Sequence, residues 1–492
     1  ILPSDALGIH NTSNGTKVDS SFGTSDSHQT ADGLMARAFY SYDDRYMFTA
    51  TIRRDGYSAF GASNPYAYFP SFAFGWNFKE ESFVNWDALS TGKLRLSWGK
   101  NGNRALSDPY ISIANLGSGT GATMGYIDPS TGEMVEMKYL GIDRLENPNL
   151  QWEKTSSLNM GVDYGFLNDR ITGALDVYFT QTHDMIMSQR LPGFSGFSSI
   201  ATNLGEVDNR GFELSINTVN ITNRHFEWTT NFAFSYNKNE IKSLYGDMED
   251  VVNDKGEVIG QKEADDISNG WFIGHPIGEI WNYQTVGIWQ KDEVEEAARY
   301  GQQPGDPKIA NRYTQDDKVN SDGTVTPVYN DNDKVFMGQT SPPINWSIRN
   351  DFKYKNWEAS INIYSYMGHK SLNGEFMNGF DSGSLYKNNY NPFVSKYWTV
   401  DNPTNEYARL NAQAPAGASA YKLINRNFIR LDNISIAYTL PKAITSRWNM
   451  DRVKFSASIR NVGTWAKEWE YGDPETGGLA TRTFNFGVDV TL

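Results

Sequence analysis

The chain has 492 residues, a formal net charge of −14 and no cysteine, and 39% of its residues are hydrophobic. The acidic charge argues against binding of nucleic acid, whose phosphates require a basic surface, and the lack of cysteine excludes disulfide bonds and thiolate-ligated metals. No apolar run approaches the ~20 residues that a membrane-spanning helix needs, so the sequence does not predict a helical membrane protein.

Aromatic residues make up 14% of the chain. Transmembrane β-barrels carry such residues in two girdles, one at each membrane interface. A secreted all-β carbohydrate-binding protein would also be rich in them. Composition alone therefore leaves both classes open.

Residues 1–31 are rich in Ser, Thr, Asp and Gly and are predicted to be the tail of an extracellular loop. From residue 32 onward, apolar and polar residues alternate in segments that end in turn-forming residues, and this pattern predicts β-strands. About thirteen strands of roughly the ~9–11 residues that cross a bilayer are predicted. They lie near residues 33–42, 45–55, 70–80, 92–100, 155–167, 170–181, 205–219, 225–240, 344–355, 357–367, 427–440, 452–462 and 481–492.

Charged side chains keep to one face of these strands, which is expected of a wall between lipid and water. The residues predicted to face lipid or an interface include Ile348, Phe352, Ile361, Ile363, Phe455, Ile459, Phe486 and Val488. Those predicted to face the lumen include Arg349, Asp351, Lys353, Lys454 and Arg460.

The connections between predicted strands alternate in length. Short links near 43–44, 167–169, 220–224 and 355–356 alternate with long ones near 101–154, 182–204, 241–343, 368–426 and 463–480. Short periplasmic turns and long extracellular loops are typical of outer-membrane barrels. Because thirteen strands cannot close an antiparallel barrel of even strand number, we interpret residues 32–492 as the C-terminal part of a longer all-β transmembrane barrel.

Several segments resemble the SusC-like (RagA/SusC) TonB-dependent transporters of Bacteroidota outer membranes. They are RRDGYSAFG at 53–61, YFPSF at 68–72, LRLSWG at 94–99, NLQWEKT at 149–155, GEVDNRGFE at 205–213, GHPIG at 274–278, GIWQ at 287–290 and FIRL at 428–431. The resemblance extends in order from about residue 37 to the end of the chain.

The resemblance implies a 22-stranded barrel with an N-terminal plug, of which this chain would supply roughly the last thirteen strands. It also implies import of oligosaccharides or peptides, a SusD-like surface lipoprotein as partner, and coupling to the TonB complex through an N-terminal region absent from these residues. No enzymatic activity is expected. A passive porin-like channel and a secreted carbohydrate-binding protein are the alternatives.

Four aromatic residues near the GHPIG segment are candidates for substrate binding: Trp271, Trp281, Tyr283 and Trp289. Aromatic faces stack on sugar rings and on peptide side chains. The favoured alternative is aromatic packing that folds the loop or meets a partner. Residues 293–299 are expected to form a short solvated helix in the same loop.

The segment 316–323 resembles a calcium-binding loop because its carboxylates alternate and a glycine follows them. Asp317, Asn320 and Asp322 are the candidate ligands, although Lys318 occupies the first ligand position of the family's pattern. An acidic turn without a metal is the alternative. No other metal or cofactor is predicted, since the six histidines do not cluster.

Overall fold

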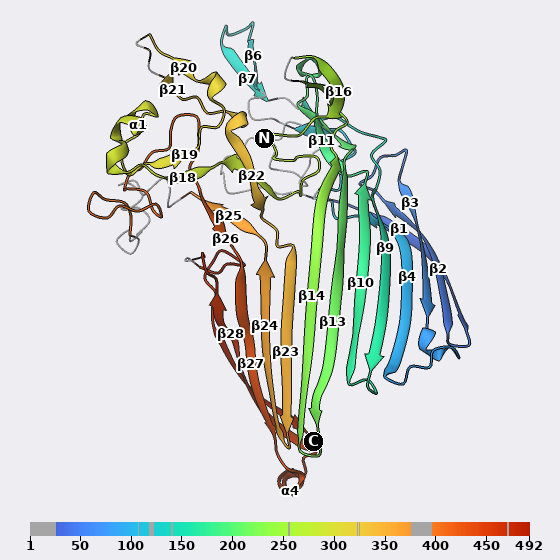
Figure 1. The fold of residues 1–492 in the computed structure, drawn as a ribbon. Coiled ribbons are helices and arrows are strands. Elements are labelled where there is room, and N and C mark those ends of the chain that lie inside the picture. Colours follow the sequence, from blue (N-terminus) through green and yellow to red (C-terminus); the bar gives the residue numbers. More distant parts are fainter. Residues whose placement is uncertain are drawn as a thin grey trace. The chain divides into compact units, whose positions relative to one another are not determined.

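The structure, a computed structural model, describes residues 26–106, 108–117, 123–138, 141–253, 256–321, 323, 325–374, 396–469 and 472–492. Its main element is one sheet of thirteen strands (Figure 1). No helix in these ranges has the length and apolar character needed to cross a membrane.

The thirteen strands follow one another in the sheet in the order of the sequence. They are β1 (Ala31–Tyr42), β2 (Tyr46–Tyr57), β3 (Tyr66–Trp76), β4 (Leu89–Asn103), β9 (Glu153–Phe166), β10 (Ile171–His183), β13 (Glu206–Thr222), β14 (Phe226–Ser243), β23 (Ile344–Tyr354), β24 (Trp357–Met367), β27 (Phe428–Thr439), β28 (Arg452–Trp465) and β29 (Thr483–Thr491). All thirteen predicted strands are therefore present, and the predicted number is confirmed.

One predicted strand is displaced. The strand expected near 70–80 is β3, which begins at Tyr66 and ends at Trp76. Beyond it, the chain turns into the 3-10 helix η3 (Phe78–Glu80), and Glu81 accepts hydrogen bonds from the Tyr46 hydroxyl and from Trp76 Nε1. This local network, which alternation does not reveal, ends the strand early.

Contacts divide the chain into two units. The first contains residues 1–169, 174–212 and 239–266, as far as these are described, and the second contains 170–173, 213–238 and 267–492.

In the second unit, strand register separates an apolar face from a polar face. Ile348 pairs with Ile363, and Ile361 pairs with Ile434. Because directly paired residues lie on the same side of a sheet, these side chains form one apolar face across β23, β24 and β27. Ile459 with Phe484, and Phe455 with Val488, extend this face to β29.

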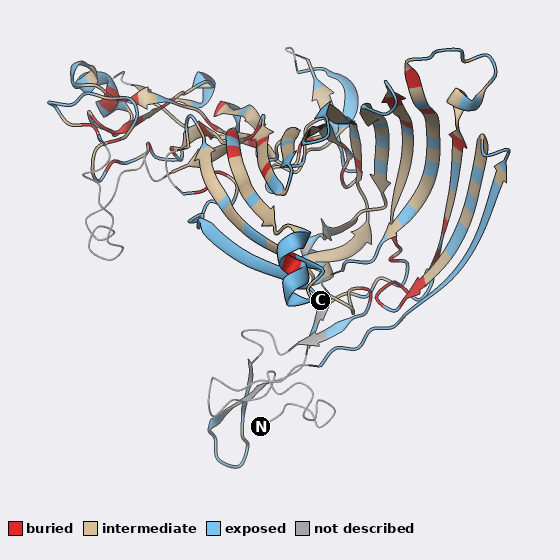
Figure 2. Cartoon of the chain, turned by 90° about the horizontal axis from the view of Figure 1, so that it is seen from below, coloured by how far each residue is buried: buried red, intermediate tan, exposed pale blue. Residues whose placement is uncertain are grey.

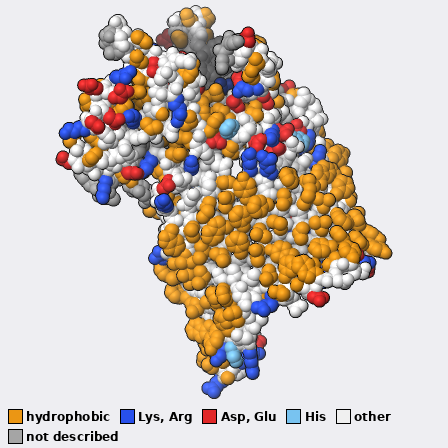
Figure 3. Space-filling model, in the orientation of Figure 1, with side chains coloured by type: hydrophobic (Ala, Val, Ile, Leu, Met, Phe, Trp, Pro, Cys, Tyr) orange, Lys and Arg blue, Asp and Glu red, His pale blue; other side chains and the backbone are white. Residues whose placement is uncertain are grey.

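The first unit has the same two faces. On β2, β3 and β4, Ala50 pairs with Phe72, which pairs with Trp98, and the rings of Phe72 and Trp98 stack with centroids 6.1 Å apart. Arg53 and Arg95 lie at alternate positions and so belong to the opposite, polar face. Figure 3 shows hydrophobic side chains gathered over the strands and charged ones over the segments beyond their ends.

The short connections are tight turns. Asp43 and Asp44 have φ values of 54° and 51° in the link between β1 and β2, and Leu167, Asn168 and Asp169 have φ values of 57–58° in the link between β9 and β10. Asn and Asp tolerate this left-handed region better than most residues. These turns join strands over the predicted short links.

The long connections, in which the sequence predicted no strands, are not structureless. Eight two-stranded antiparallel sheets lie in their described parts. The pairs are β5 (Asn115–Gly117) with β8 (Gly141–Arg144), β6 (Thr123–Ile127) with β7 (Met134–Lys138), β11 (Ile186–Arg190) with β12 (Ser199–Asn203), β15 (Met248–Val252) with β16 (Val258–Glu263), β17 (Glu279–Tyr283) with β22 (Lys334–Gln339), β18 (Thr285–Ile288) with β19 (Pro307–Ile309), β20 (Lys318–Val319) with β21 (Val325–Thr326), and β25 (Lys370–Asn373) with β26 (Lys422–Asn425). None of them joins the thirteen-stranded sheet.

The helices of the described residues are short. They are α1 (Val294–Arg299), α4 (Lys442–Thr445) and the 3-10 segments η3, η4 (Gly193–Ser195), η5 (Lys291–Glu293), η6 (Thr314–Asp316), η7 (Asp331–Asp333) and η9 (Ser446–Trp448). The helix predicted at 293–299 is confirmed as α1, although Ala297 is fully buried rather than solvated.

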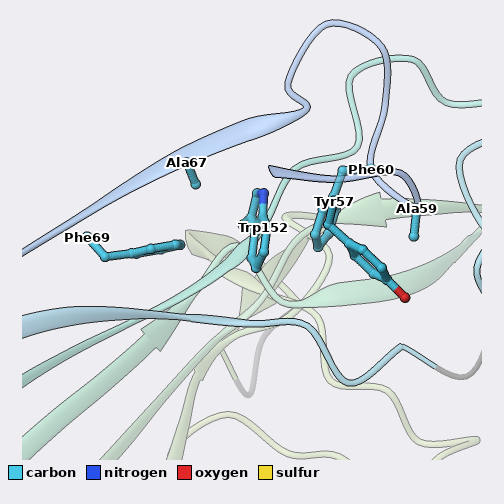
Figure 4. Close-up of a cluster of buried hydrophobic side chains, with 6 residues drawn as sticks. All are labelled: Tyr57, Ala59, Phe60, Ala67, Phe69 and Trp152. Carbon is cyan, nitrogen blue, oxygen red and sulfur yellow. The ribbon is translucent and has the colours of Figure 1, made fainter. Parts of the chain in front are cut away.

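Buried side chains lie mainly in and beside the long connections. In the first unit, Trp152 packs against Phe60 and Phe69, with ring centroids 4.5 Å and 5.6 Å away, in a cluster that also contains Tyr57, Ala59 and Ala67 (Figure 4). Every residue of β29 and nearly every residue of β1 is exposed, and Figure 2 shows such pale blue strands at the edges of the sheet. A sheet that is one layer thick has no interior of its own, so the clusters of buried apolar side chains lie mainly in the connections.

Candidate functional site

The polar face of the second unit contains a cavity of 590 Å³ whose charged side chains neutralise one another. Arg349 Nη2 lies 2.9 Å from Asp351 Oδ1, and Lys454 Nζ lies 2.6 Å from Glu358 Oε2. Both pairs are partly exposed to solvent, where ion pairs contribute little to stability. Their effect is to present water with a hydrophilic but locally neutral surface.

The polar face of the first unit is organised around Arg95. Its Nη2 lies 2.8 Å from Asp163 Oδ1 and 2.9 Å from Asp176 Oδ2, so one guanidinium joins β4, β9 and β10. A planar guanidinium has enough donors to bind two carboxylates at once. These two ion pairs link the polar side chains of three neighbouring strands.

In the second unit, segments 284–333 and 396–421 pack together into one folded body, which we call the loop body. At its centre, the buried Asp306 carboxylate lies 2.9 Å from Arg409 Nε and accepts hydrogen bonds from the backbone N–H groups of Gln303 and Gln413. Gln302 Nε2 donates to the carbonyl of Gln413 at 2.7 Å. Residues about a hundred positions apart are thus held by buried polar contacts.

Two of the predicted aromatic residues are buried, Trp289 inside this loop body and Tyr283 against it. The Trp289 side chain is 1% exposed, and its Nε1 donates to Gln302 Oε1 at 2.9 Å. Tyr283 packs with Tyr329, Ile309 and Ala420 in a buried cluster. Burial raises the pKa of the Tyr329 hydroxyl, which donates to the Ile309 carbonyl at 3.0 Å.

The other two predicted aromatic residues are more accessible. Trp281 is half-buried, its ring lies 4.9 Å from that of Phe272, and Lys334 Nζ lies 4.4 Å from its centroid. Trp271 is also half-buried. The structure therefore does not bring the four residues together on one surface, and only Trp271 and Trp281 have faces that a substrate could reach.

The predicted calcium ligands have protein partners of their own. Asp317 Oδ1 accepts from the backbone N–H of Val328 at 2.9 Å, and Asn320 Nδ2 donates to Thr326 Oγ1. Asp322 lies outside the described residues. In the described ranges, no group of three or more His, Cys, Asp or Glu side chains is arranged to hold a metal.

A buried ionic cluster on the polar face of the second unit was not predicted. Arg430 of β27 binds both oxygens of Asp473, at 2.7 Å and 2.6 Å, and the Tyr364 hydroxyl donates to Glu475 at 2.6 Å. Arg430 and Asp473 are 7% and 3% exposed. The cluster holds the connection between β28 and β29 against β24 and β27, and its only signal in the sequence is an arginine on an otherwise apolar segment.

His369 lies in the two-residue link between β24 and β25 and is 4% exposed. Burial lowers its pKa to about 4, and the nearby Arg426 cation acts in the same direction. Its Nδ1 has no hydrogen-bond partner among the described residues. The imidazole is therefore neutral at physiological pH.

The family model described as "TonB dependent receptor-like, beta-barrel" matches residues 3–277. The chain thus belongs to the TonB-dependent receptor-like β-barrel family and is an outer-membrane β-barrel protein. Its apolar face is the lipid-facing wall and its polar face is the lumenal wall.

Two curated relatives and one solved structure define this similarity further. The chain is 30% identical to TonB-dependent receptor P3 of Formosa agariphila over 445 residues. This alignment covers 90% of this chain and 42% of that protein. It is 31% identical over 425 residues to TonB-dependent receptor SusC of Bacteroides thetaiotaomicron, covering 83% of this chain and 38% of that one.

The fold is similar to that of the RagAB peptide transporter, with a TM-score of 0.72 and 23% identity over 94% of this chain and 48% of that one. This chain spans less than half the length of these relatives. Their names are those of receptors and transporters, not of enzymes.

Proposed function

We propose that this chain forms the greater part of the barrel of an energised outer-membrane importer for oligomeric nutrients, either oligosaccharides or peptides. In this proposal, a SusD-like surface lipoprotein delivers the substrate, and the TonB complex supplies the energy through a region that these residues do not contain. No chemical step is assigned to the chain.

The observation that carries the proposal is the opposite character of the two faces of one sheet. An apolar face that continues from β23 to β29 suits lipid, and a polar face with self-neutralised ion pairs suits a water-filled route. A secreted binding protein would have to bury the apolar face, whereas here residues such as Phe486, at 83%, and Val488, at 64%, are exposed.

The loop body supports delivery by a partner rather than free diffusion. In this chain, residues 284–333 and 396–421 form a folded structure held by a buried ion pair and buried hydrogen bonds. Folded loops of this length in compact domains are usually functional. We assign to the loop body the contact with the lipoprotein and the substrate.

Uptake by cells that express the full-length transporter tests the proposal. Defined oligosaccharides and peptides are supplied with and without the gene for TonB. Uptake of at least one class that disappears without TonB is expected. Uptake that continues without TonB identifies a passive channel and contradicts energised import.

The role of the loop body is tested by a deletion designed from the register of β17 and β22. Tyr283 pairs with Lys334, so a short glycine linker can replace residues 284–333 without disturbing this pair. We expect the barrel to keep its heat-modifiable mobility on gels while the lipoprotein no longer co-purifies. A variant with only the hairpin tip 128–132 replaced by glycines is the control. Full retention of lipoprotein and uptake in the deletion variant would show that the loop body has another role.

A further inference from the structure

The lumenal wall of the first unit contains a second cavity, separate from the predicted aromatic site. Its volume is 450 Å³, within the usual range for small-ligand sites. Its lining includes Asp32, Arg53, Asp55, Asn101, Arg104 and Trp152. Residues of β1, β2 and β4 therefore meet there beside the aromatic cluster of Figure 4.

The two carboxylates of this cavity are already engaged. Asp55 Oδ1 lies 2.7 Å from Arg53 Nε, and Asp32 Oδ2 lies 3.4 Å from Arg54 Nη2. Glycines give these carboxylates room. A Cβ atom at Gly33 would lie 2.7 Å from Asp55 Oδ1, and one at Gly56 would lie 2.4 Å from Asp32 Oδ1.

Arg104, in contrast, is not engaged by a carboxylate among the residues that the structure describes. Arg104 is exposed, and no carboxylate of the described residues forms an ion pair with it. Trp152 is 3% exposed, and its Nε1 has no hydrogen-bond partner in the described part of the chain. Because this nitrogen is itself buried, Trp152 contributes its ring to the cavity, and Arg104 is the donor that a ligand can reach.

The cavity thus has one positive charge without a counter-charge and an apolar floor. The floor exists because residue 102 is glycine. A Cβ atom there would lie 2.2 Å from the ring of Phe69 and 2.8 Å from that of Trp152. Both rings can therefore lie against this strand.

We propose that this cavity is a subsite for a carboxylate group of the imported oligomer, with Arg104 as the residue that binds its charge. Guanidinium groups bind carboxylates with paired hydrogen bonds. The carboxylate belongs either to a uronic acid of an oligosaccharide or to an acidic residue or C-terminus of a peptide. The inference rests on the proposed import function and adds a substrate class to it.

Binding to the purified full-length transporter tests the subsite. The probes are a tetramer of galacturonate with galactose tetramer as its neutral match, and N-acetylated glutamate pentapeptide with N-acetylated, C-amidated glutamine pentapeptide as its neutral match. Calorimetric titrations compare the unaltered protein with Arg104→Gln and Arg104→Lys. We expect Arg104→Gln to weaken binding of one carboxylated probe by about tenfold and to leave its neutral match unchanged, with partial recovery in Arg104→Lys. The probe that responds identifies the source of the carboxylate.

Arg37→Gln is the matched control. Arg37 lies on the same face as Arg53, since it pairs with Thr51 one strand away, but it does not line the cavity. If Arg37→Gln weakens binding of the carboxylated probe as much as Arg104→Gln does, the effect comes from the overall charge of the lumenal wall. That result would overturn the subsite. Unchanged binding of both carboxylated probes in Arg104→Gln, or no preference for them in the unaltered protein, would overturn it as well.

The same variants separate this inference from the proposed function. If Arg104→Gln binds all probes normally while TonB-dependent uptake continues, the subsite is wrong and the importer stands. If no oligomer is taken up by the unaltered protein in a TonB-dependent way, the importer itself is wrong.

Discussion

Replacing Ile361 by arginine should destabilise the inserted barrel by about 3 kcal/mol. Ile361 lies four residues from Trp357, whose ring packs 4.6 Å from that of Tyr438 near the turn at the start of β24. At about 3.3 Å per residue and a strand tilt of about 40°, Ile361 is roughly 10 Å deeper than this aromatic pair. An apolar band about 25 Å tall puts it close to the midplane, where an arginine costs about 2–4 kcal/mol.

The cost is measured by denaturant titration of the transporter in lipid vesicles, with the folded fraction read from gel mobility. Asn362→Ser is the control, because the neighbouring side chain belongs to the opposite face and Asn362 Nδ2 lies 3.4 Å from Asp432. We expect the control to change the free energy of unfolding by less than about 1 kcal/mol. Equal losses in both variants would contradict the assignment of the two faces.

Three further predictions concern the ends and the loops of the sheet. Arg430→Met should leave Asp473 buried without its partner, at a cost of about 3–5 kcal/mol, and limited proteolysis should cut the connection 466–482 faster. Protection equal to the unaltered protein would refute a stabilising role for the pair. For His369, the folded pKa of about 4 lies below the ordinary 6.5, so the folded state binds fewer protons. Local stability should therefore fall by up to about 3 kcal/mol as pH drops from 6.5 to 4, and hydrogen exchange around 368–374 should show this in the unaltered protein but not in His369→Asn. Deleting β29 should remove the only partner of β28 on that side and prevent barrel insertion, whereas normal surface levels of the truncated protein would refute this.

The sheet could be predicted from the sequence because its signal is local. Alternation along a strand is a direct consequence of backbone geometry, and one side facing lipid forces it to be strict. The predicted lipid-facing Ile348 and Phe455 and the predicted lumenal Arg349 and Lys454 accordingly fall on opposite faces in the observed register. Even so, strand ends such as that of β3 depended on a hydrogen-bond network around Glu81.

The loop body could not be predicted in the same way. Its buried contacts join residues about a hundred positions apart, such as Asp306 and Arg409, and nothing in a local pattern distinguishes these from solvated charges. The sequence favoured packing within the loop for Trp289, and its burial agrees with this, but the residues against which it packs could not be predicted. The eight small sheets were missed because strands of two to six residues carry too few alternations to be recognised.

The buried contacts of the loop body also determine how it responds to change. Trp398 Nε1 donates to Gln290 Oε1 at 3.0 Å, and Asn405 Oδ1 accepts from the backbone N–H of Ile288 at 2.9 Å. Separating segment 396–421 from segment 284–333 would therefore expose the Asp306 carboxylate and several apolar side chains at once. Because each exposed polar group and each lost apolar contact adds to the cost, the two segments should open together or not at all. A partner that binds either segment would consequently act on both, even though the two lie in different connections of the barrel.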